Sequence, residues 1–316
     1  MSFTGNDGIA MKRRSATAFI ITFSLLLCST SVQSFDNLHF LFSVSRLSDG
    51  ANLRDPQGLA VSRETGDILI ADTGNDRLCI LSAHGVLVKS VGRVAGIQSP
   101  IGAAFGKDEG IYLTEIGTRQ IKRLSFNGSP LPPIVPQTHD ETSPLPGRII
   151  VDGKGNIYAA DRAEPRVLII SGSDYMTRQI QQTPGSREPQ WKVQDVEVDG
   201  VGNIYILSSQ GLAVHVFDAN GHHLRSFGQH GSNEDQFSFP TGVAIGPEGN
   251  LWIADSFRHE IKVFDPRGEF LSRWGITGMG DGELFYPIDI AFGKGILYVL
   301  EKGASRLQAF EISRKP

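Results

Sequence analysis

The chain has 316 residues, of which 40% are hydrophobic, 20% are charged and 36 are glycines; this composition is typical of a globular protein rich in turns. Its formal net charge of −4 argues against a nucleic-acid-binding protein, because such proteins need a concentrated positive surface to displace counterions. Of its two cysteines, Cys28 falls within a candidate signal peptide and Cys79 lies in an apolar run, so we expect no internal disulfide and a buried thiol at Cys79.

The N-terminus has the pattern of an export signal. A basic segment at residues 11–14 precedes an apolar stretch at residues 16–28, and Val32 and Ser34 supply the small residues of a cleavage site. The polar residues before Met11 do not resemble a signal, so Met11 is a second candidate for the start of the chain. The apolar stretch is too short to span a bilayer comfortably. We therefore predict an exported protein, periplasmic or extracellular, with no membrane span once the signal is removed.

The mature chain, residues 35–316, begins with a strand-like run that has no repeat of its own. A sequence motif then recurs six times. It consists of Pro-x-Gly with an apolar run, a Gly/Asn turn, an apolar run ending in Ala-Asp, a short loop with a basic residue, and another apolar run. Its clearest copy begins at Pro240. The acidic residue that ends the second apolar run, or the residue that replaces it, recurs every 43 to 47 residues. These positions are Asp72, Glu115, Asp161, Ser208, Asp255 and Glu301.

A period in the forties that is built of short strands is typical of a β-propeller blade. We therefore predict one all-β domain after the signal at residues 1–34: a six-bladed propeller of four-stranded antiparallel blades, with strands A to D running from the axis outward. The sixth repeat lacks a fourth strand. We expect the N-terminal strand to complete this blade and close the ring, because closure removes exposed sheet edges.

The repeats resemble the NHL-repeat family of six-bladed β-propellers. The resemblance covers residues 36–313 and rests on two linkers, residues 227–242 and 274–287, and on the acid-loop-basic segments at residues 71–77 and 254–260. It implies the fold and leaves the function open, because propellers carry unrelated sites. Some relatives, the amidating lyases, hold zinc with histidines around the channel; the eight histidines of this chain fall outside the predicted channel mouth, so we predict no zinc site.

The repeated acids have a structural interpretation and a catalytic one. Asp72 with Arg77 shares its spacing with two other acid–arginine pairs, and Glu115 with Arg119 is one residue shorter. Such regularity favours a structural role, in which each acid braces its own B–C loop. The alternative is a ring of ligands or catalytic carboxylates. The acids concerned are Asp72, Glu115, Asp161, Asp255 and Glu301.

Strand A opens with a glycine in three blades and with a charged residue in the other three. Because strand A is innermost, Arg148, Asp195 and Asp289 should converge near the axis, on the face that carries the B–C loops. Glu197 should point to the same side of its strand as Asp195. These charges either bind a polar ligand or metal, or neutralise one another and plug the channel. Two long linkers, residues 127–146 and 173–191, should overhang the same face and suit recognition of a protein or peptide.

Together these patterns predict a monomeric, exported scaffold that binds a protein partner of the cell envelope or of an extracellular assembly. Its ligand-binding residues would be Arg148, Asp195, Glu197 and Asp289, with no cofactor and no catalytic residue assigned. The alternative is a lyase or hydrolase, related to the amidating lyases or to lactonases, in which the same carboxylates hold a divalent ion such as calcium. A third hypothesis is that the protein is an architectural module of a larger surface assembly. The sequence leaves enzymatic activity undecided.

Overall fold

The computed structural model describes Met1 and residues 37–107, 110–138, 142–182 and 189–313. Contacts divide the chain into two units, Met1–Val32 and Gln33–Pro316, and the second contains the folded domain. The predicted signal peptide and its cleavage site lie outside the described residues.

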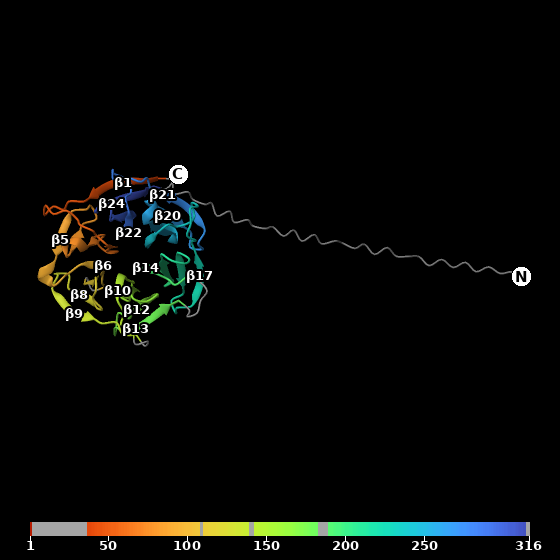
Figure 1. The fold of residues 1–316 in the computed structure, drawn as a ribbon, viewed down its shortest axis with the longest axis horizontal. Coiled ribbons are helices and arrows are strands. Elements are labelled where there is room, and N and C mark those ends of the chain that lie inside the picture. Colours follow the sequence, from red (N-terminus) through yellow and green to blue (C-terminus); the bar gives the residue numbers. More distant parts are fainter. Residues whose placement is uncertain (2–36, 108–109, 139–141, 183–188, 314–316) are drawn as a thin grey trace. The chain divides into compact units, whose positions relative to one another are not determined.

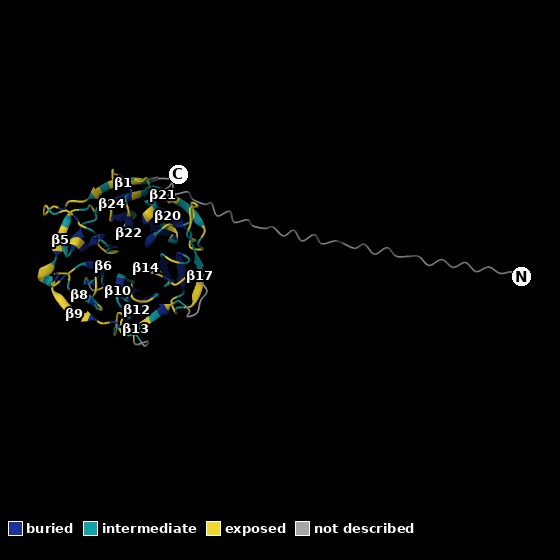
Figure 2. Ribbon diagram, in the orientation of Figure 1, coloured by how far each residue is buried: buried dark blue, intermediate teal, exposed yellow. Residues whose placement is uncertain are grey.

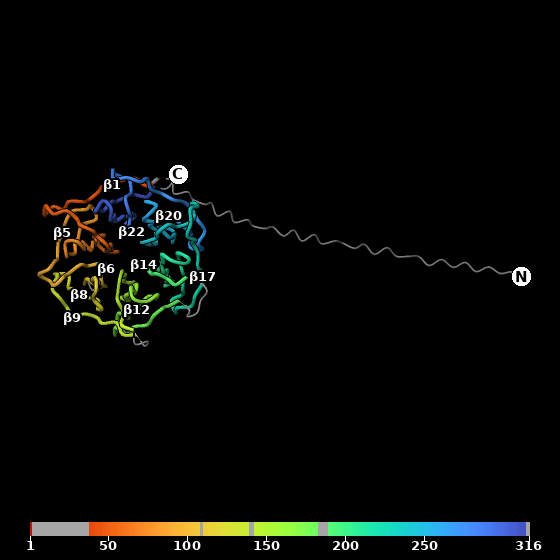
Figure 3. The backbone as a smooth tube through the Cα atoms, in the orientation of Figure 1, coloured from red at the N-terminus to blue at the C-terminus, as the bar shows by residue number. Residues whose placement is uncertain are grey.

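Six four-stranded antiparallel sheets surround a central axis (Figure 1). The predicted six-bladed β-propeller is therefore confirmed. The tube in Figure 3 passes once around the axis, so consecutive blades are neighbours. Strands A to D are, for blade 1, β2 (Gly58–Val61), β3 (Ile68–Asp72), β4 (Arg77–Leu81) and β5 (Leu87–Val91); for blade 2, β6 (Pro100–Phe105), β7 (Ile111–Glu115), β8 (Ile121–Leu124) and β9 (Pro130–Ile134); for blade 3, β10 (Pro146–Val151), β11 (Ile157–Asp161), β12 (Arg166–Ile170) and β13 (Thr177–Gln181).

The other three blades have the same order, with one difference in the last. Their strands are, for blade 4, β14 (Val193–Val198), β15 (Ile204–Ser208), β16 (Val214–Phe217) and β17 (His223–Phe227); for blade 5, β18 (Pro240–Ile245), β19 (Leu251–Asp255), β20 (Glu260–Phe264) and β21 (Phe270–Trp274); for blade 6, β22 (Pro287–Gly293), β23 (Ile296–Glu301), β24 (Arg306–Ser313) and β1 (Asn37–Val44). Short 3-10 turns occupy η1 (Thr73–Asn75), η2 (Arg93–Ala95), η3 (Pro247–Gly249) and η4 (Ser256–Arg258).

The N-terminal strand closes the ring, as predicted. β1 pairs antiparallel with β24, with Asn37 opposite Ser313 and Val44 opposite Leu307. The first and last strands thus share one sheet, and opening the ring would require breaking this ladder.

The core lies between the blades rather than within any one of them. Every residue of β3, β11 and β19 is buried (Figure 2), because both faces of a middle strand are covered by neighbouring blades. Alternate residues of β3 therefore face different clusters: Ile70 packs with blade 6 and Leu69 packs with blade 2. Cys79 is a free, buried cysteine of β4, and burial raises the pKa of its thiol to about 12, so it acts as a small apolar residue.

Two segments that the sequence presents as linkers contain strands. Residues 127–146 include β9, and residues 173–191 include β13. The prolines Pro130, Pro132 and Pro133 fit β9 because it is the edge strand of its blade, where a missing N–H costs no ladder hydrogen bond. The true D–A linkers are accordingly shorter than the sequence suggests. Within the described residues, no helix has the length and apolar character needed to cross a membrane.

Candidate functional site at the central channel

The six repeat positions perform one shared structural task. Each accepts a backbone N–H from the linker that enters its own blade, at 2.7 to 3.3 Å. The side chains and donors are Asp72 with Arg54, Glu115 with Gln98, Asp161 with Leu145, Ser208 with Lys192, Asp255 with Ser238 and Phe239, and Glu301 with Phe285. Blade 4 keeps the bond although it lacks the acid. These contacts fix the linkers to strand B and leave little of each carboxylate for a ligand.

Most of the acids also pair with a basic residue of strand C. Arg77 Nε lies 2.6 Å from Asp72, and Arg166 Nε lies 2.6 Å from Asp161; Glu301 pairs with Arg306 in the same way. The sequence pairing of Glu115 with Arg119 is wrong. Lys122 Nζ, on β8, lies 2.7 Å from Glu115, whereas the exposed Arg119 donates to the Ser143 carbonyl. The one-residue difference in spacing places Arg119 in the loop, so its side chain points away from the strand-B acid.

The structure brings together the three charged residues that open strand A. Arg148 Nη1 lies 2.8 Å from Asp289 Oδ1 and 3.7 Å from Asp195 Oδ2, and Arg148 Nη2 donates to the Ile288 carbonyl at 2.7 Å. No N–H of Nη1 is aligned for a hydrogen bond to any described residue, so its attraction to the two carboxylates is Coulombic. We call Arg148, Asp195 and Asp289 the channel layer.

Strand A begins with the same backbone irregularity in five of the six blades. The register of strand A against strand B shifts beside Asp195 and Asp289, between Pro146 and Ile149, and equally beside Gly102 and Gly242. The bulge is therefore a feature of the repeat, and the residue type at this position decides which blades contribute a charge. The glycine blades show why the layer is confined to three blades: a Cβ on Gly242 would lie 2.8 Å from the Asp289 Cα.

Each carboxylate oxygen of the two channel-layer acids accepts one backbone hydrogen bond. Asp195 accepts N–H groups from Val196 at 2.9 Å and Val243 at 3.0 Å. Asp289 accepts them from Ile290 at 3.0 Å and Leu59 at 2.8 Å. Each carboxylate therefore joins its own blade to the next one around the ring.

Burial governs the ionisation of the channel carboxylates. Desolvation raises the pKa of Asp289 to about 7; Arg148 opposes this rise and Asp195 adds to it. Desolvation likewise raises the pKa of Asp195 against the pull of Arg148, and it raises the pKa of Glu197 to about 7. Carboxylates removed from water favour their neutral form, so the channel contains groups that titrate near neutral pH.

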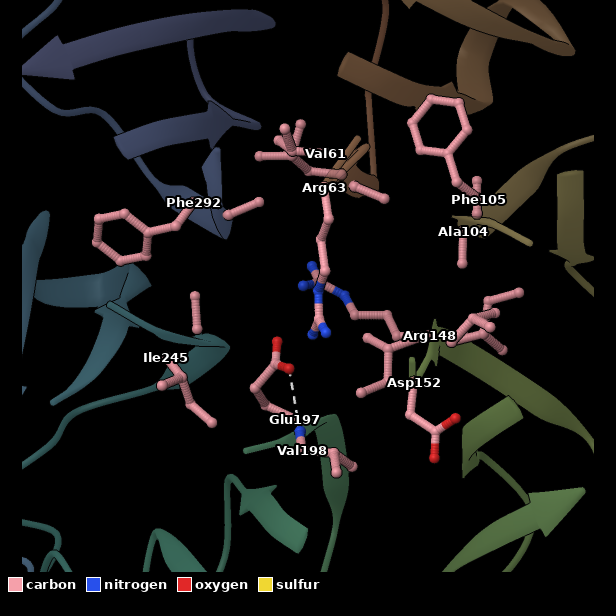
Figure 4. Close-up of a pocket in the computed structure, with 18 of the residues that line it drawn as sticks. Val61, Arg63, Ala104, Phe105, Arg148, Asp152, Glu197, Val198, Ile245 and Phe292 are labelled. Carbon is pink, nitrogen blue, oxygen red and sulfur yellow. Dashed lines mark hydrogen bonds between the residues drawn. The ribbon is translucent and has the colours of Figure 1, made fainter. Parts of the chain in front are cut away.

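The channel layer separates two cavities, and Arg148 lines both. The wide cavity, about 1110 Å³, lies among the D–A linkers and B–C loops. The narrow cavity, about 600 Å³, lies among the A–B turns (Figure 4). Glu197 lines the narrow cavity, on the other side of the layer from the loop face to which the sequence assigned it. On β14, Asp195 and Glu197 line the narrow cavity, whereas Val193 and Gln194 line the wide one.

The wide cavity has an aromatic wall that the sequence analysis missed. The rings of Phe239 and Phe257 stack with centroids 4.6 Å apart, and Tyr286 meets Phe257 edge-on at 6.2 Å. Phe257 is 58% exposed. A signal was present in the sequence: Phe257 stands where blade 1 has Gly74, and Phe239 and Tyr286 both precede the proline of strand A. Trp191, from the second long linker, also lines this cavity.

The donor set of the channel layer does not fit a divalent cation. All four oxygens of Asp195 and Asp289 accept backbone N–H groups, and the Arg148 guanidinium lies between the two side chains. A cation at that place would face a fixed positive charge. The described part of the chain contains no group of three or more His, Cys, Asp and Glu side chains placed to hold a metal ion.

Comparison with known proteins identifies the repeats. The family model for the NHL repeat matches residues 53–81 and 237–264, in blades 1 and 5. The chain thus carries NHL repeats at two places within a six-bladed β-propeller. No curated protein sequence matches it significantly.

Solved structures share the propeller fold at low sequence identity. A virginiamycin B lyase from Staphylococcus aureus is 17% identical, with a TM-score of 0.60 over 88% of this chain and 89% of the lyase. A gluconolactonase from Xanthomonas campestris is 16% identical, with a TM-score of 0.64 over 88% of this chain and 95% of the other. Hydrazine synthase from Kuenenia stuttgartiensis is 11% identical, with a TM-score of 0.60 over 84% and 97%. The three names describe different chemistries, so the likeness establishes the fold alone.

Proposed function

We propose that this NHL-repeat propeller is a monomeric, exported binding module that holds a protein partner at its wide cavity. The observation that carries the proposal is the exposed aromatic wall formed by Phe239, Phe257 and Tyr286. Aromatic side chains are enriched where proteins bind one another, because they bury large apolar areas at a small cost in conformational entropy. Phe257 is held by two ring contacts and yet remains largely open to solvent.

The shape and charge of the wide cavity support a peptide segment as the part of the partner that binds. Its volume of about 1110 Å³ is slightly above the range of about 300–1,000 Å³ for small-molecule pockets. Beside the aromatic wall, Arg162, Gln190 and Gln194 of blades 3 and 4 also line the cavity and supply donors and acceptors. An apolar anchor residue against Phe257, with backbone groups bonded to these polar side chains, would use both parts of the lining.

The channel layer forms the floor of this partner site. Because Asp195 and Asp289 already accept backbone N–H groups and are paired electrostatically with Arg148, we assign the layer a supporting role beneath the ligand. Arg148 contributes the one layer side chain that also lines the wide cavity. Of the four ligand-binding residues predicted from the sequence, this assignment keeps only Arg148 at the partner site, and it adds the aromatic wall.

The binding proposal is tested with two matched variants. Phe257→Ala removes the exposed ring, and Val201→Ala shortens an 83% exposed side chain on the A–B turn face. Each protein is crosslinked to the envelope fraction of its host, and the captured partner is then purified for affinity measurement. We expect wild type and Val201→Ala to bind equally and Phe257→Ala to bind at least about tenfold more weakly. Equal affinity of all three would place the interface elsewhere.

Export is part of the same proposal and rests on the sequence alone. N-terminal sequencing of the secreted or periplasmic protein should find Phe35 as the first residue. Retention of the uncleaved chain in the cytoplasm would contradict export.

The alternative, a calcium-dependent lyase or hydrolase, is favoured by the fold that this chain shares with a lyase and a gluconolactonase. The position of Arg148 opposes a metal ion at Asp195 and Asp289. We therefore propose that the binding function requires no cofactor. Metal analysis separates the two functions: one calcium ion per chain, lost in Asp195→Asn, would favour the enzyme.

A further inference from the structure

The narrow cavity is a second candidate site, separate from the proposed partner site. It lies on the side of the channel layer where the A strands end, and its volume of about 600 Å³ is within the usual range for small-molecule pockets. The six A strands contribute its walls, so its shape is set by the rigid inner ring of the propeller. Arg148, Asp195 and Asp289 of the channel layer also line this cavity, but the proposed partner site does not use it.

Two opposite charges face each other inside the narrow cavity. Figure 4 shows the guanidinium of Arg63 and the carboxylate of Glu197 turned toward one another, with Arg148 beside them. Arg63, in the turn after β2, forms no hydrogen bond or ion pair with any described residue. Oε1 of Glu197 accepts the Val198 N–H at 3.0 Å, and Oε2 accepts no hydrogen bond from the described part of the chain. Both charged groups therefore have free bonding capacity directed into the cavity.

Apolar side chains line part of the cavity around this charged pair, and the carboxylates of Asp152, Asp195 and Asp289 line other parts of it. Val61, Ala104, Phe105, Ile245 and Phe292 line the cavity from four different blades (Figure 4). An apolar wall excludes water and strengthens hydrogen bonds formed inside it. The walls of the cavity also shield Glu197 from water, and this desolvation raises its pKa to about 7.

We propose that the narrow cavity binds a small molecule that carries a carboxylate next to a hydrogen-bond donor on an apolar body. The planar guanidinium of Arg63 matches a carboxylate through two parallel N–H bonds. The free oxygen of Glu197 accepts the donor, and the apolar body packs against Phe105 and Phe292. Apolar α-amino acids and apolar 2-hydroxy acids share this chemistry, with an ammonium or a hydroxyl as the donor.

Calorimetric titration of the purified protein with four probes tests this site. L-phenylalanine and L-phenyllactate carry both groups, 3-phenylpropionate lacks the donor, and phenethylamine lacks the carboxylate. We expect a complete probe to bind with a Kd of about 1 mM or tighter, and the two incomplete probes to bind several-fold more weakly. No binding by either complete probe up to about 10 mM, ten times that Kd, would overturn the proposal.

Variants assign the binding to the two charges. We expect Arg63→Ala to weaken binding of the complete probes about tenfold or more. Arg63→Lys should weaken it less, because lysine keeps the positive charge although it lacks the planar guanidinium. Glu197→Gln keeps an acceptor but loses the charge, so it should weaken phenylalanine more than phenyllactate and thereby distinguish the two ligand sources. Val201→Ala, on the same face outside the cavity, should bind as wild type. Unchanged binding in Arg63→Ala would refute the assignment.

This site stands independently of the proposed partner site. Phe257→Ala, which removes the aromatic wall of the wide cavity, should leave probe binding unchanged. The two proposals can therefore fail separately, and a loss of probe binding in Phe257→Ala would contradict the separation of the cavities by the channel layer.

Discussion

The wide and narrow cavities share the same inner strands but differ in what surrounds them. The wide cavity takes its aromatic wall from B–C loops and D–A linkers, where neighbouring blades differ most in sequence. The narrow cavity takes its apolar side chains from the ends of the A strands, where the blades are most alike, and its charged residues include Arg63 and Glu197 together with the channel layer. Loops thus supply a surface suited to a large partner, and the rigid ring supplies a smaller site. The channel layer keeps the two apart.

The largest effect on the channel layer, which separates the two cavities, is expected from the removal of Arg148. Arg148→Met leaves two buried carboxylates, Asp195 and Asp289, without their counter-charge. We expect the free energy of unfolding to fall by about 4 kcal/mol at pH 8, because an unpaired buried charge is strongly destabilising. Urea denaturation measures the change. Adding Asp195→Asn and Asp289→Asn to this variant should restore part of the loss, and a single variant as stable as wild type would show that the layer is not a stabilising plug.

The second prediction concerns the repeat positions at the end of strand B, which hold the linkers, for comparison with the channel layer. Asp161→Ala removes the partner of Arg166, which is 1% exposed, and also releases the Leu145 N–H of the linker. We expect a loss of about 3 kcal/mol in unfolding free energy. Ser208→Ala, at the same position of blade 4, removes a neutral hydrogen bond and should cost about 1 kcal/mol. Equal costs measured by urea denaturation would mean that the arginine pairing adds nothing to the shared linker contact.

The third prediction uses the pKa of Glu197, which burial raises to about 7. In the unfolded chain the pKa of Glu197 lies near its ordinary value of 4.5, so between these two pH values the folded state binds more protons. Stability contributed by this group is therefore present at low pH and is lost as pH rises toward 7. Relative to wild type, Glu197→Gln should gain about 2 kcal/mol between pH 5 and pH 7, since each unit of pH is worth about 1.4 kcal/mol. Parallel stability–pH curves for the two proteins would contradict the raised pKa.

The smallest effect is expected at the aromatic wall. Phe257→Ala should lower the unfolding free energy by less than about 1 kcal/mol, because an exposed side chain far from the core adds little to stability. A small cost would fit a residue that serves binding more than folding. Thermal unfolding of Phe257→Ala beside Val201→Ala checks this; a loss of several kcal/mol would show that the ring is part of the core.

The sequence alone determined the fold of this chain, the closure of the ring and the meeting of the channel residues. A repeated pattern of apolar runs and turns permits one architecture, and strand A must then lie innermost, which brings Arg148, Asp195 and Asp289 together. Regular spacing also predicted a structural role for the acids of the repeat, and their contacts with linkers and strand C fit that prediction. These inferences succeed because they depend on periodicity and on the order of strands, which do not require knowledge of individual side-chain contacts.

Only the tertiary structure decided how those residues use their bonding capacity. It showed that every carboxylate oxygen of Asp195 and Asp289 accepts a backbone N–H, that Lys122 takes the place assigned to Arg119, and that Glu197 faces a second cavity with Arg63. Residues 63 and 197 are far apart in sequence and come from turns and strand ends of different blades. Their meeting depends on the curvature of the ring and on where each side chain crosses the channel layer, and no spacing along the chain encodes that geometry.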